Sequence, residues 1–420
     1  MYALCDCNNF FVSCERVFRP DLRNKPVVVL SGNDGCVVAR SNEVKKLGIK
    51  MGVPFYQIRQ LAEECGIVRF SSNFELYGDL SSRIMTILGR YTDMLQQYSI
   101  DEAYLDISYC DDTAAAKELG THIKNEIQKG VGVPVSIGIA DTKTLCKVAA
   151  DYAKHYAGYK GVCAISTVEQ RRKALAGFPV EDVWGIGRQS AAKLHKAGVT
   201  TALEFADHTE VFAKNLLNLP GLQTWRELNG VDCIRLNDSP EKASITCSRT
   251  FAHGVTDRNL LEQALSEFCT RVAEKLRRQH CVCSEMAVFA DTSRFLDNRQ
   301  TLYVTLHFPV PTDNTQEMNL AMLQAVRQRW KPDTPYKRAG VVLLSIRPGK
   351  GVQQSLFDDR NRQRDMQLQK TIDLINFKSG KRTVGFVPQV DVQKAKDLYS
   401  VGAKSPAYST RIEDIITLHC

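Results

Sequence analysis

The chain has 420 residues, of which 44% are apolar and 24% charged, an ordinary composition for a globular protein of about three domains. No stretch approaches the ~20 apolar residues of a membrane span, and no secretory signal opens the sequence. Fourteen cysteines are spread through apolar runs, a pattern typical of reduced thiols. These features exclude a membrane protein and a disulfide-stabilised secreted domain, and we expect a cytoplasmic protein.

The net charge of +8 is unevenly placed along the chain. It sums to zero over residues 1–240, +5 over 241–350 and +3 over 351–420. A neutral front and a basic back are typical of a protein whose later part meets a polyanion.

The first 165 residues alternate strand-like and helical patterns. Strands are predicted at 2–7, 25–30, 36–39, 95–100, 103–107, 133–139 and 162–165, and helices at 10–18, 41–47, 54–65, 73–91, 113–129 and 142–154. Asn8 and Asn9 are candidate caps of the first helix. With the insertion 26–70 set aside, the order strand, helix, two hairpin strands, helix, strand predicts a ferredoxin-like α+β sheet.

Three carboxylates are expected to meet in this sheet. Asp101 and Glu102 occupy the corner of the predicted hairpin, and Asp6 ends the first strand. An isolated acidic pair is more often solvated, but three converging carboxylates repel one another unless a cation intervenes. Two Mg²⁺ ions about 3.5–4 Å apart would suit such a site and an in-line phosphoryl transfer. Both hairpin residues can face the metals only if regular pleating is interrupted there.

The remainder of the chain predicts two further parts. The pattern turns helical from residue 166, and residues 183–199 predict two helices joined by a tight Gly185-x-Gly187 turn, whose amides can contact a phosphate without reading base sequence. Residues 243–347 predict a separate α/β domain with strands at 245–251, 285–290, 303–308 and 339–345 and helices at 260–279 and 316–330. We expect no independent core in the last fifty-five residues.

Two motifs stand out within this framework. They are Asp6-x-Asn8-x-Phe10-Phe11-x-x-x-Glu15 and Ser99-Ile100-Asp101-Glu102-Ala103, and the Gly185–Lys193 hairpin follows them. In this order they resemble the Y family of lesion-bypass DNA polymerases over residues 1 to about 345. The tail Ser405-Pro406-Ala407-Tyr408-Ser409-Thr410-Arg411 resembles that of the UmuC branch, the catalytic subunits of bacterial DNA polymerase V, with Ser409 where Thr is usual.

The resemblance implies a right-hand polymerase built from named parts. These are a ferredoxin-like palm (1–21 and 78–165), small fingers (22–77), a helical thumb with a helix-hairpin-helix (166–240), an α/β little finger (243–347), a linker with a clamp-binding peptide (348–365) and a C-terminal partner-binding tail (366–420).

The resemblance also assigns residue roles. The metal ligands are Asp6, Asp101, Glu102 and the backbone carbonyl of Cys7, holding two Mg²⁺ ions. Phe11 matches the steric gate that excludes a 2′-hydroxyl, and its neighbour Phe10 in the same nucleotide-site motif is assigned to core packing. Other matches are the base-pair roof Cys36 and Val38, Asn42 where many relatives have Tyr, the triphosphate-binding Lys45 and Lys154, and the DNA-binding Gly185, Gly187 and Lys193.

Partners follow from the same resemblance. Gln353-Gln354-Ser355-Leu356-Phe357 resembles the peptide by which bacterial polymerases dock on the sliding clamp, with Gln353, Leu356 and Phe357 as anchors, although the apolar pair could instead pack on the little finger. The tail implies a UmuD′-like dimer and the RecA filament in the SOS response, and nucleoid association when active.

The predicted reaction is error-prone extension of a primed DNA template with dNTP. Two alternatives stay open at this point: a nucleotidyl cyclase, which can use a related sheet and carboxylates, and a non-catalytic scaffold that binds DNA and the clamp.

Overall fold

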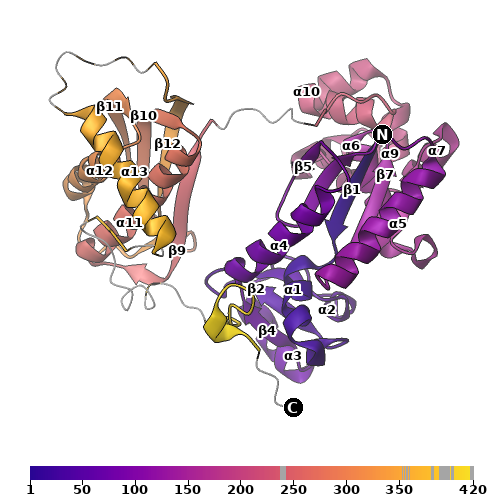
Figure 1. Ribbon diagram of the computed structural model, residues 1–420, viewed down its shortest axis with the longest axis horizontal. Coiled ribbons are helices and arrows are strands. Elements are labelled where there is room, and N and C mark those ends of the chain that lie inside the picture. Colours follow the sequence, from indigo (N-terminus) through magenta and orange to yellow (C-terminus); the bar gives the residue numbers. More distant parts are fainter. Residues whose placement is uncertain are drawn as a thin grey trace. The chain divides into compact units, whose positions relative to one another are not determined.

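The computed structural model describes residues 1–236, 243–351, 360–379, 383–386 and 402–416, with the single residues 353, 355, 358 and 398 (Figure 1). The chain divides into two compact units, Met1–Ser239 with Ala403–Cys420, and Pro240–Gly402. Within the described residues, no helix combines the length and hydrophobicity needed to cross a bilayer.

The first unit is organised around a five-stranded sheet in the order β5-β6-β1-β7-β8. The strands are β1 (Tyr2–Cys7), β5 (Leu95–Gln97), β6 (Glu102–Asp106), β7 (Val135–Ala140) and β8 (Val162–Ile165). β1 pairs antiparallel with β6 and β7, β5 pairs antiparallel with β6, and β8 joins β7 in parallel. This is the predicted ferredoxin-like sheet with one strand added at its edge.

Helices cover both faces of this sheet. They are α1 (Phe10–Phe18), α4 (Phe74–Leu88), α5 (Thr113–Gly130) and α6 (Lys143–His155). Successive residues of β1 face opposite sides, so Ala3 and Cys5 pack with α1, α4 and α5, whereas Tyr2 and Leu4 pack with α6. The apolar residues of β1 therefore pack into two hydrophobic cores, one on each face of the sheet. This packing fixes the position of Asp6 at the end of the strand.

A second, three-stranded sheet of order β3-β2-β4 forms the predicted fingers region. Its elements are η1 (Pro20–Leu22), β2 (Val27–Leu30), β3 (Val37–Arg40), α2 (Asn42–Lys46), η2 (Phe55–Ile58), α3 (Arg59–Glu64) and β4 (Val68–Ser71). Two local predictions are wrong. The helix predicted at 54–65 is interrupted at Ile58, whose φ of −112° and ψ of 8° are not helical. Asn9 has φ 47° and its side chain does not cap α1.

The helical region that follows packs on α6. It contains η3 (Ala157–Tyr159) before β8, then α7 (Val168–Ala176), η4 (Val180–Asp182), α8 (Arg188–Lys196), α9 (Ala202–Asp207) and α10 (Glu210–Leu228). Buried Glu227 of α10 accepts hydrogen bonds from the Thr144 amide (2.9 Å) and hydroxyl (3.0 Å) at the start of α6. The helix predicted to open the hairpin at residue 183 is wrong: residues 183–187 are not helical, and the short 3₁₀ turn η4 ends just before them.

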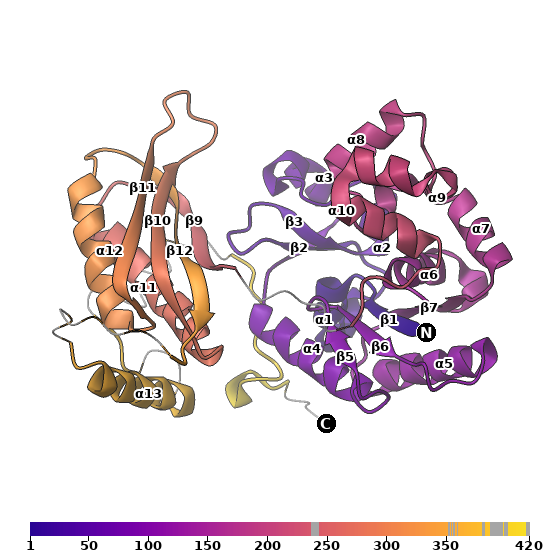
Figure 2. The same cartoon turned by 90° about the horizontal axis from the view of Figure 1, so that it is seen from above.

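The second unit is a four-stranded antiparallel sheet, β11-β10-β12-β9, whose strands Figure 2 shows side by side. Its elements are β9 (Ile245–Val255), α11 (Arg258–Arg278), β10 (Cys281–Thr292), β11 (Thr301–Thr312), α12 (Thr315–Arg329) and β12 (Tyr336–Pro348). All six predicted segments are present, and α11 and α12 share one core with the sheet.

One helix of the second unit lacks a counterpart in the sequence prediction. α13 (Arg362–Lys378) spans the expected border between linker and tail. Arg277 of α11 pairs with Asp373 of α13 at 2.7 and 2.8 Å, and Arg362 pairs with Glu317 of α12 at 2.6 Å. From Ala403 onward the chain belongs to the first unit, where η5 (Ile412–Asp414) lies.

Candidate active site

Three carboxylates lie at one end of the first sheet. Asp6 of β1 is opposite Glu102, the first residue of β6, in the antiparallel register. Asp101 lies in the bend before β6, and its backbone carbonyl accepts a hydrogen bond of 2.9 Å from the Cys7 amide. The Ser99 hydroxyl donates to Asp101 Oδ1 at 2.5 Å and accepts from the Asp101 amide at 3.2 Å. The chain thus leaves regular pleating at the corner, as the shared site requires.

Two lysines of α6 lie on these carboxylates. Lys154 Nζ is 2.9 Å from Asp6 Oδ1, and Lys147 Nζ is 3.0 and 2.9 Å from the two oxygens of Glu102. The lysines are seven residues apart, close to two helical turns, so they share one face of α6. Sequence reasoning singled out Lys154 and missed Lys147, although this spacing on a predicted helix was an available signal.

Repulsion among the carboxylates is visible in the electrostatics of Glu102. Burial raises the pKa of Glu102, Lys147 opposes this shift, and the charges of Asp6 and Asp101 add to it. A nearby cation stabilises the charged form of such a buried carboxylate. Carboxylate oxygens are also the donors that Mg²⁺ prefers, so the chemistry of the donor set fits a divalent ion.

The arrangement itself is not that of a closed metal site. Across the part of the chain that the structure describes, no three Asp, Glu, His or Cys side chains form a group that could hold a metal ion. Ammonium groups lie instead on Asp6 and Glu102. The ligand roles of these residues, of Asp101 and of the Cys7 carbonyl therefore stay predictions.

A basic group adjoins Asp6. The pKa of half-buried Lys45 on α2 is lowered by burial and by the positive charges of Lys154 and Arg40, and Asp6 opposes this shift. Clustered ammonium groups of this kind favour an anionic ligand. The structure thus brings together the two lysines predicted to hold the triphosphate.

Phe11 is set in an aromatic stack beside this site. Its ring lies parallel to that of Tyr77 on α4, with centroids 4.5 Å apart and planes at 15°, and meets Phe74 edge-on at 5.8 Å. Phe10 is only 3% exposed in the core, which confirms its packing role. Tyr77, which the sequence did not single out, is the main support of the Phe11 ring.

The other predicted nucleotide-site residues belong to the smaller sheet. Val38 lies on β3, and Cys36 directly precedes this strand and forms an isolated bridge with Pro54; both residues are half-buried. Exposed Asn42 accepts a hydrogen bond of 3.0 Å from the Asn9 side chain, which explains the orientation of Asn9 away from the α1 amides.

The glycine turn before α8 is sterically required. Gly185 has φ +91°, and a Cβ there would lie 2.2 Å from Thr224 Oγ1. Gly187 is the N-cap residue of α8, and Lys193 donates to the Leu216 carbonyl at 3.3 Å. Trp184, directly before Gly185, donates its indole N–H to the Tyr98 hydroxyl at 3.0 Å. Tyr98 directly follows β5, so this hydrogen bond connects the glycine turn to the carboxylate hairpin.

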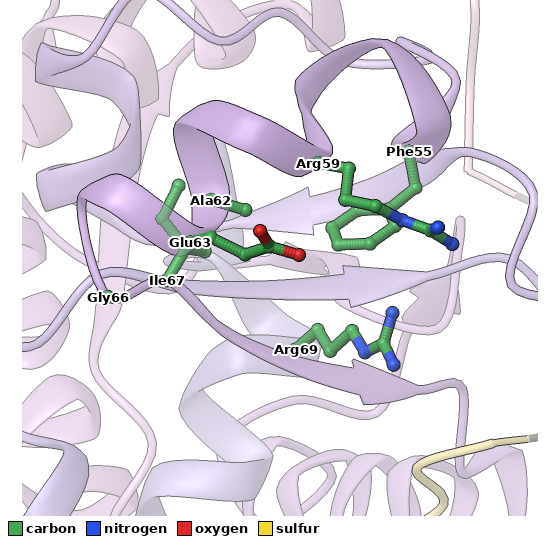
Figure 3. Close-up of a pocket in the computed structure, with 7 residues that line it drawn as sticks. All are labelled: Phe55, Arg59, Ala62, Glu63, Gly66, Ile67 and Arg69. Carbon is green, nitrogen blue, oxygen red and sulfur yellow. The ribbon is translucent and has the colours of Figure 1, made fainter.

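Two features lie apart from the predicted site. A pocket on the small sheet, shown in Figure 3, is lined by Phe55, Arg59, Ala62, Glu63, Gly66, Ile67 and Arg69; none of these residues was predicted to be functional. In the predicted clamp peptide Gln353 is exposed, whereas Leu356 and Phe357 lie outside the described residues.

This palm-like sheet with converging carboxylates, a small second sheet, a helical region with a hairpin and a separate α/β unit define the architecture of the Y-family DNA polymerases. A solved Y-family DNA polymerase chimera of Dbh and Dpo4 has the same fold, with a TM-score of 0.67 and 21% identity over 83% of this chain and 99% of that chain.

Sequence comparison identifies the family within this class. Residues 5–151 match the impB/mucB/samB family, and residues 242–356 match its C-terminal domain. Protein SamB from Salmonella typhimurium is 39% identical over 99% of both chains, and protein UmuC from the same species is 38% identical over 99% of both chains. The chain belongs to the impB/mucB/samB family. The predicted resemblance to the Y family and to UmuC is thereby confirmed.

Proposed function

We propose that the chain is an error-prone, template-directed DNA polymerase for translesion synthesis in the SOS response. The primer 3′-hydroxyl attacks the α-phosphate of a dNTP, and pyrophosphate leaves. The observation that carries this proposal is the meeting of Asp6, Asp101 and Glu102 beside Lys45 and Lys154, in a chain of this family. Membership of the impB/mucB/samB family favours neither the nucleotidyl cyclase nor the non-catalytic scaffold.

Asp6, Asp101, Glu102 and the Cys7 carbonyl are the proposed holders of two Mg²⁺ ions. Mg²⁺ supplies Lewis-acid activation of the attacking oxygen and neutralises charge that develops at phosphorus. In the absence of substrate, Lys154 and Lys147 compensate the carboxylates. Lys154 is then positioned to bind the triphosphate when a nucleotide enters.

The remaining residues are proposed to select and hold the substrates. Phe11 excludes the 2′-hydroxyl, and small Cys36 and Val38 leave room for distorted template bases. The Gly185 and Gly187 amides, with Lys193, bind duplex backbone independently of sequence.

The proposed protein partners rest on the full-length similarity to UmuC. They are a UmuD′-like dimer, the RecA filament and the sliding clamp, the last through Gln353, Leu356 and Phe357.

Primer extension with Mg²⁺, dNTP and a primed template tests the function. Asp101→Ala should lower extension by about a thousandfold or more, because charge held at the reacting phosphate contributes several kcal/mol. Asp111→Ala, which removes an exposed carboxylate of the same unit, is the control. DNA binding without extension in the presence of every proposed partner would favour the scaffold, and formation of a cyclic nucleotide would favour the cyclase.

A further inference from the structure

A segment from the end of the chain is built into the first unit. The Ala403 carbonyl accepts a hydrogen bond from the Ser71 amide and the Ala403 amide donates to the Ser71 hydroxyl, each at 3.0 Å. Ser71 belongs to β4, an edge strand of the small sheet, and Lys404 bridges it in parallel. Residues 403–411, in yellow in Figure 1, thus begin with a single bridge to a sheet edge, where extended peptides commonly bind.

Side-chain contacts fix the register of this segment. Asn73 Nδ2 lies 3.0 Å from the Ser405 carbonyl and 3.1 Å from the Pro406 carbonyl. The Tyr408 ring stacks on Phe18 of α1 with centroids 4.9 Å apart and planes at 14°. The segment is therefore anchored on both sides of Ser405, which is only 7% exposed.

Ser405 reaches a fully buried carboxylate. The Ser405 hydroxyl donates to Glu15 Oε1 at 3.0 Å, and the Tyr77 hydroxyl donates to the same oxygen at 2.6 Å. Among the residues that the structure describes, Glu15 Oε2 has no hydrogen-bond partner. Burial raises the pKa of Glu15, and both hydroxyls oppose this shift. A buried carboxylate with so few donors depends strongly on each of them.

Tyr77 connects this carboxylate to the nucleotide site, because its ring is stacked on Phe11. We propose that Ser405 is a positioning residue for sugar selection: through Glu15 and Tyr77 it holds the Phe11 ring in place. This inference rests on the proposed polymerase function and on Phe11 as its gate. The inference gives residues 403–411 a role within their own chain. Ser405 follows Glu15 by 390 residues in the sequence.

The contact predicts a specific kinetic effect. In Ser405→Ala, Glu15 Oε1 loses one of the two described hydroxyl donors that fix it, so the carboxylate, the Tyr77 hydroxyl bound to it and the stacked Phe11 ring gain freedom. The ratio of kcat/KM for a dNTP to kcat/KM for the matching rNTP should fall by about tenfold, which is what one lost hydrogen bond supplies. A general loss of folded protein would lower both values together and leave their ratio unchanged.

The test uses the full chain, with any partner needed for extension, Mg²⁺ and a primed template. Ser405→Thr keeps the hydroxyl and should keep the ratio. Lys404→Ala removes the neighbouring exposed contact to Glu75 and should also keep it. An unchanged ratio in Ser405→Ala, together with a lowered ratio in Phe11→Ala, would overturn the inference and leave the gate intact.

Two further outcomes distinguish failure of the Ser405 inference from failure of the claims on which it rests. An unchanged ratio in Phe11→Ala would overturn the role of Phe11 as the sugar gate, and the Ser405 inference with it. Failure of the unaltered chain to extend any primer would overturn the proposed polymerase function, and with it the Phe11 and Ser405 roles. Hydrogen exchange of residues 73–77 gives a readout without activity. It should be faster in Ser405→Ala than in Lys404→Ala, and equal rates would contradict the coupling.

Discussion

Lys147 on α6 pairs with both carboxylate oxygens of Glu102 on β6, at 3.0 and 2.9 Å. The same ammonium lies 4.6 Å from the centroid of the Tyr98 ring, and both partners of the ion pair are mostly shielded from solvent. Because Glu102 is buried beside Asp6 and Asp101, Lys147 is the main group that favours its charged form. The pair joins a helix on one face of the sheet to the carboxylate end.

Loss of this lysine should change the pH dependence of extension. In the proposed site, binding of Mg²⁺ needs ionised Glu102, so activity should fall as the pH drops through the pKa of Glu102, which burial raises. Lys147→Ala removes a charge that lowers this pKa. The acid limb of the kcat/KM profile should therefore move to higher pH. Lys129→Ala, which removes an exposed lysine of α5, is the control; an unmoved acid limb in Lys147→Ala would contradict the assignment of Glu102.

The Phe11 ring predicts the sugar preference. Phe11→Ala removes the flat surface against which a deoxyribose would fit, so ribonucleotide incorporation should rise by roughly tenfold to a hundredfold relative to dNTP. Single-nucleotide insertion kinetics with matched dNTP and rNTP measure this ratio. Tyr56→Ala removes an exposed ring of the same unit (72% exposed) and should leave it unchanged. Equal discrimination in both variants would exclude Phe11 as the gate.

The sheet and its carboxylate end could be predicted because their signals are local. β1 and β8 have the bounds expected from their apolar runs, and the element order places β1 beside the hairpin; the register that pairs Asp6 with Glu102 comes from the folded sheet. α13 was missed because its residues are mainly polar and only Gln369 and Ile372 of it are buried. The Ser405–Glu15 contact spans 390 residues and has no local pattern, so only the folded chain reveals it.

The predicted clamp peptide has a direct test. Replacing Leu356 and Phe357 with Ala should weaken binding to the sliding clamp by about tenfold or more, since buried apolar anchors carry most of such interfaces. Basal extension without the clamp should be unaffected. Phe377→Ala, which removes an 83% exposed ring of α13, is a matched control for binding measured by surface plasmon resonance. Equal clamp affinity in the double variant and the unaltered chain would refute the peptide assignment.

Two ion pairs attach α13 to the other helices of the second unit, Arg362–Glu317 and Arg277–Asp373, and the second can be tested by itself. Arg277 is 10% exposed and its guanidinium contacts both oxygens of Asp373, which is 32% exposed. Asp373→Ala leaves this guanidinium without its carboxylate, which should weaken docking of α13 by about 1–2 kcal/mol after allowance for solvent at Asp373. Amide exchange in α13 should then be faster relative to α11. Glu274→Ala breaks an exposed pair with Arg278 and should have almost no effect, so equal exchange in the two variants would show that Arg277 does not anchor the helix.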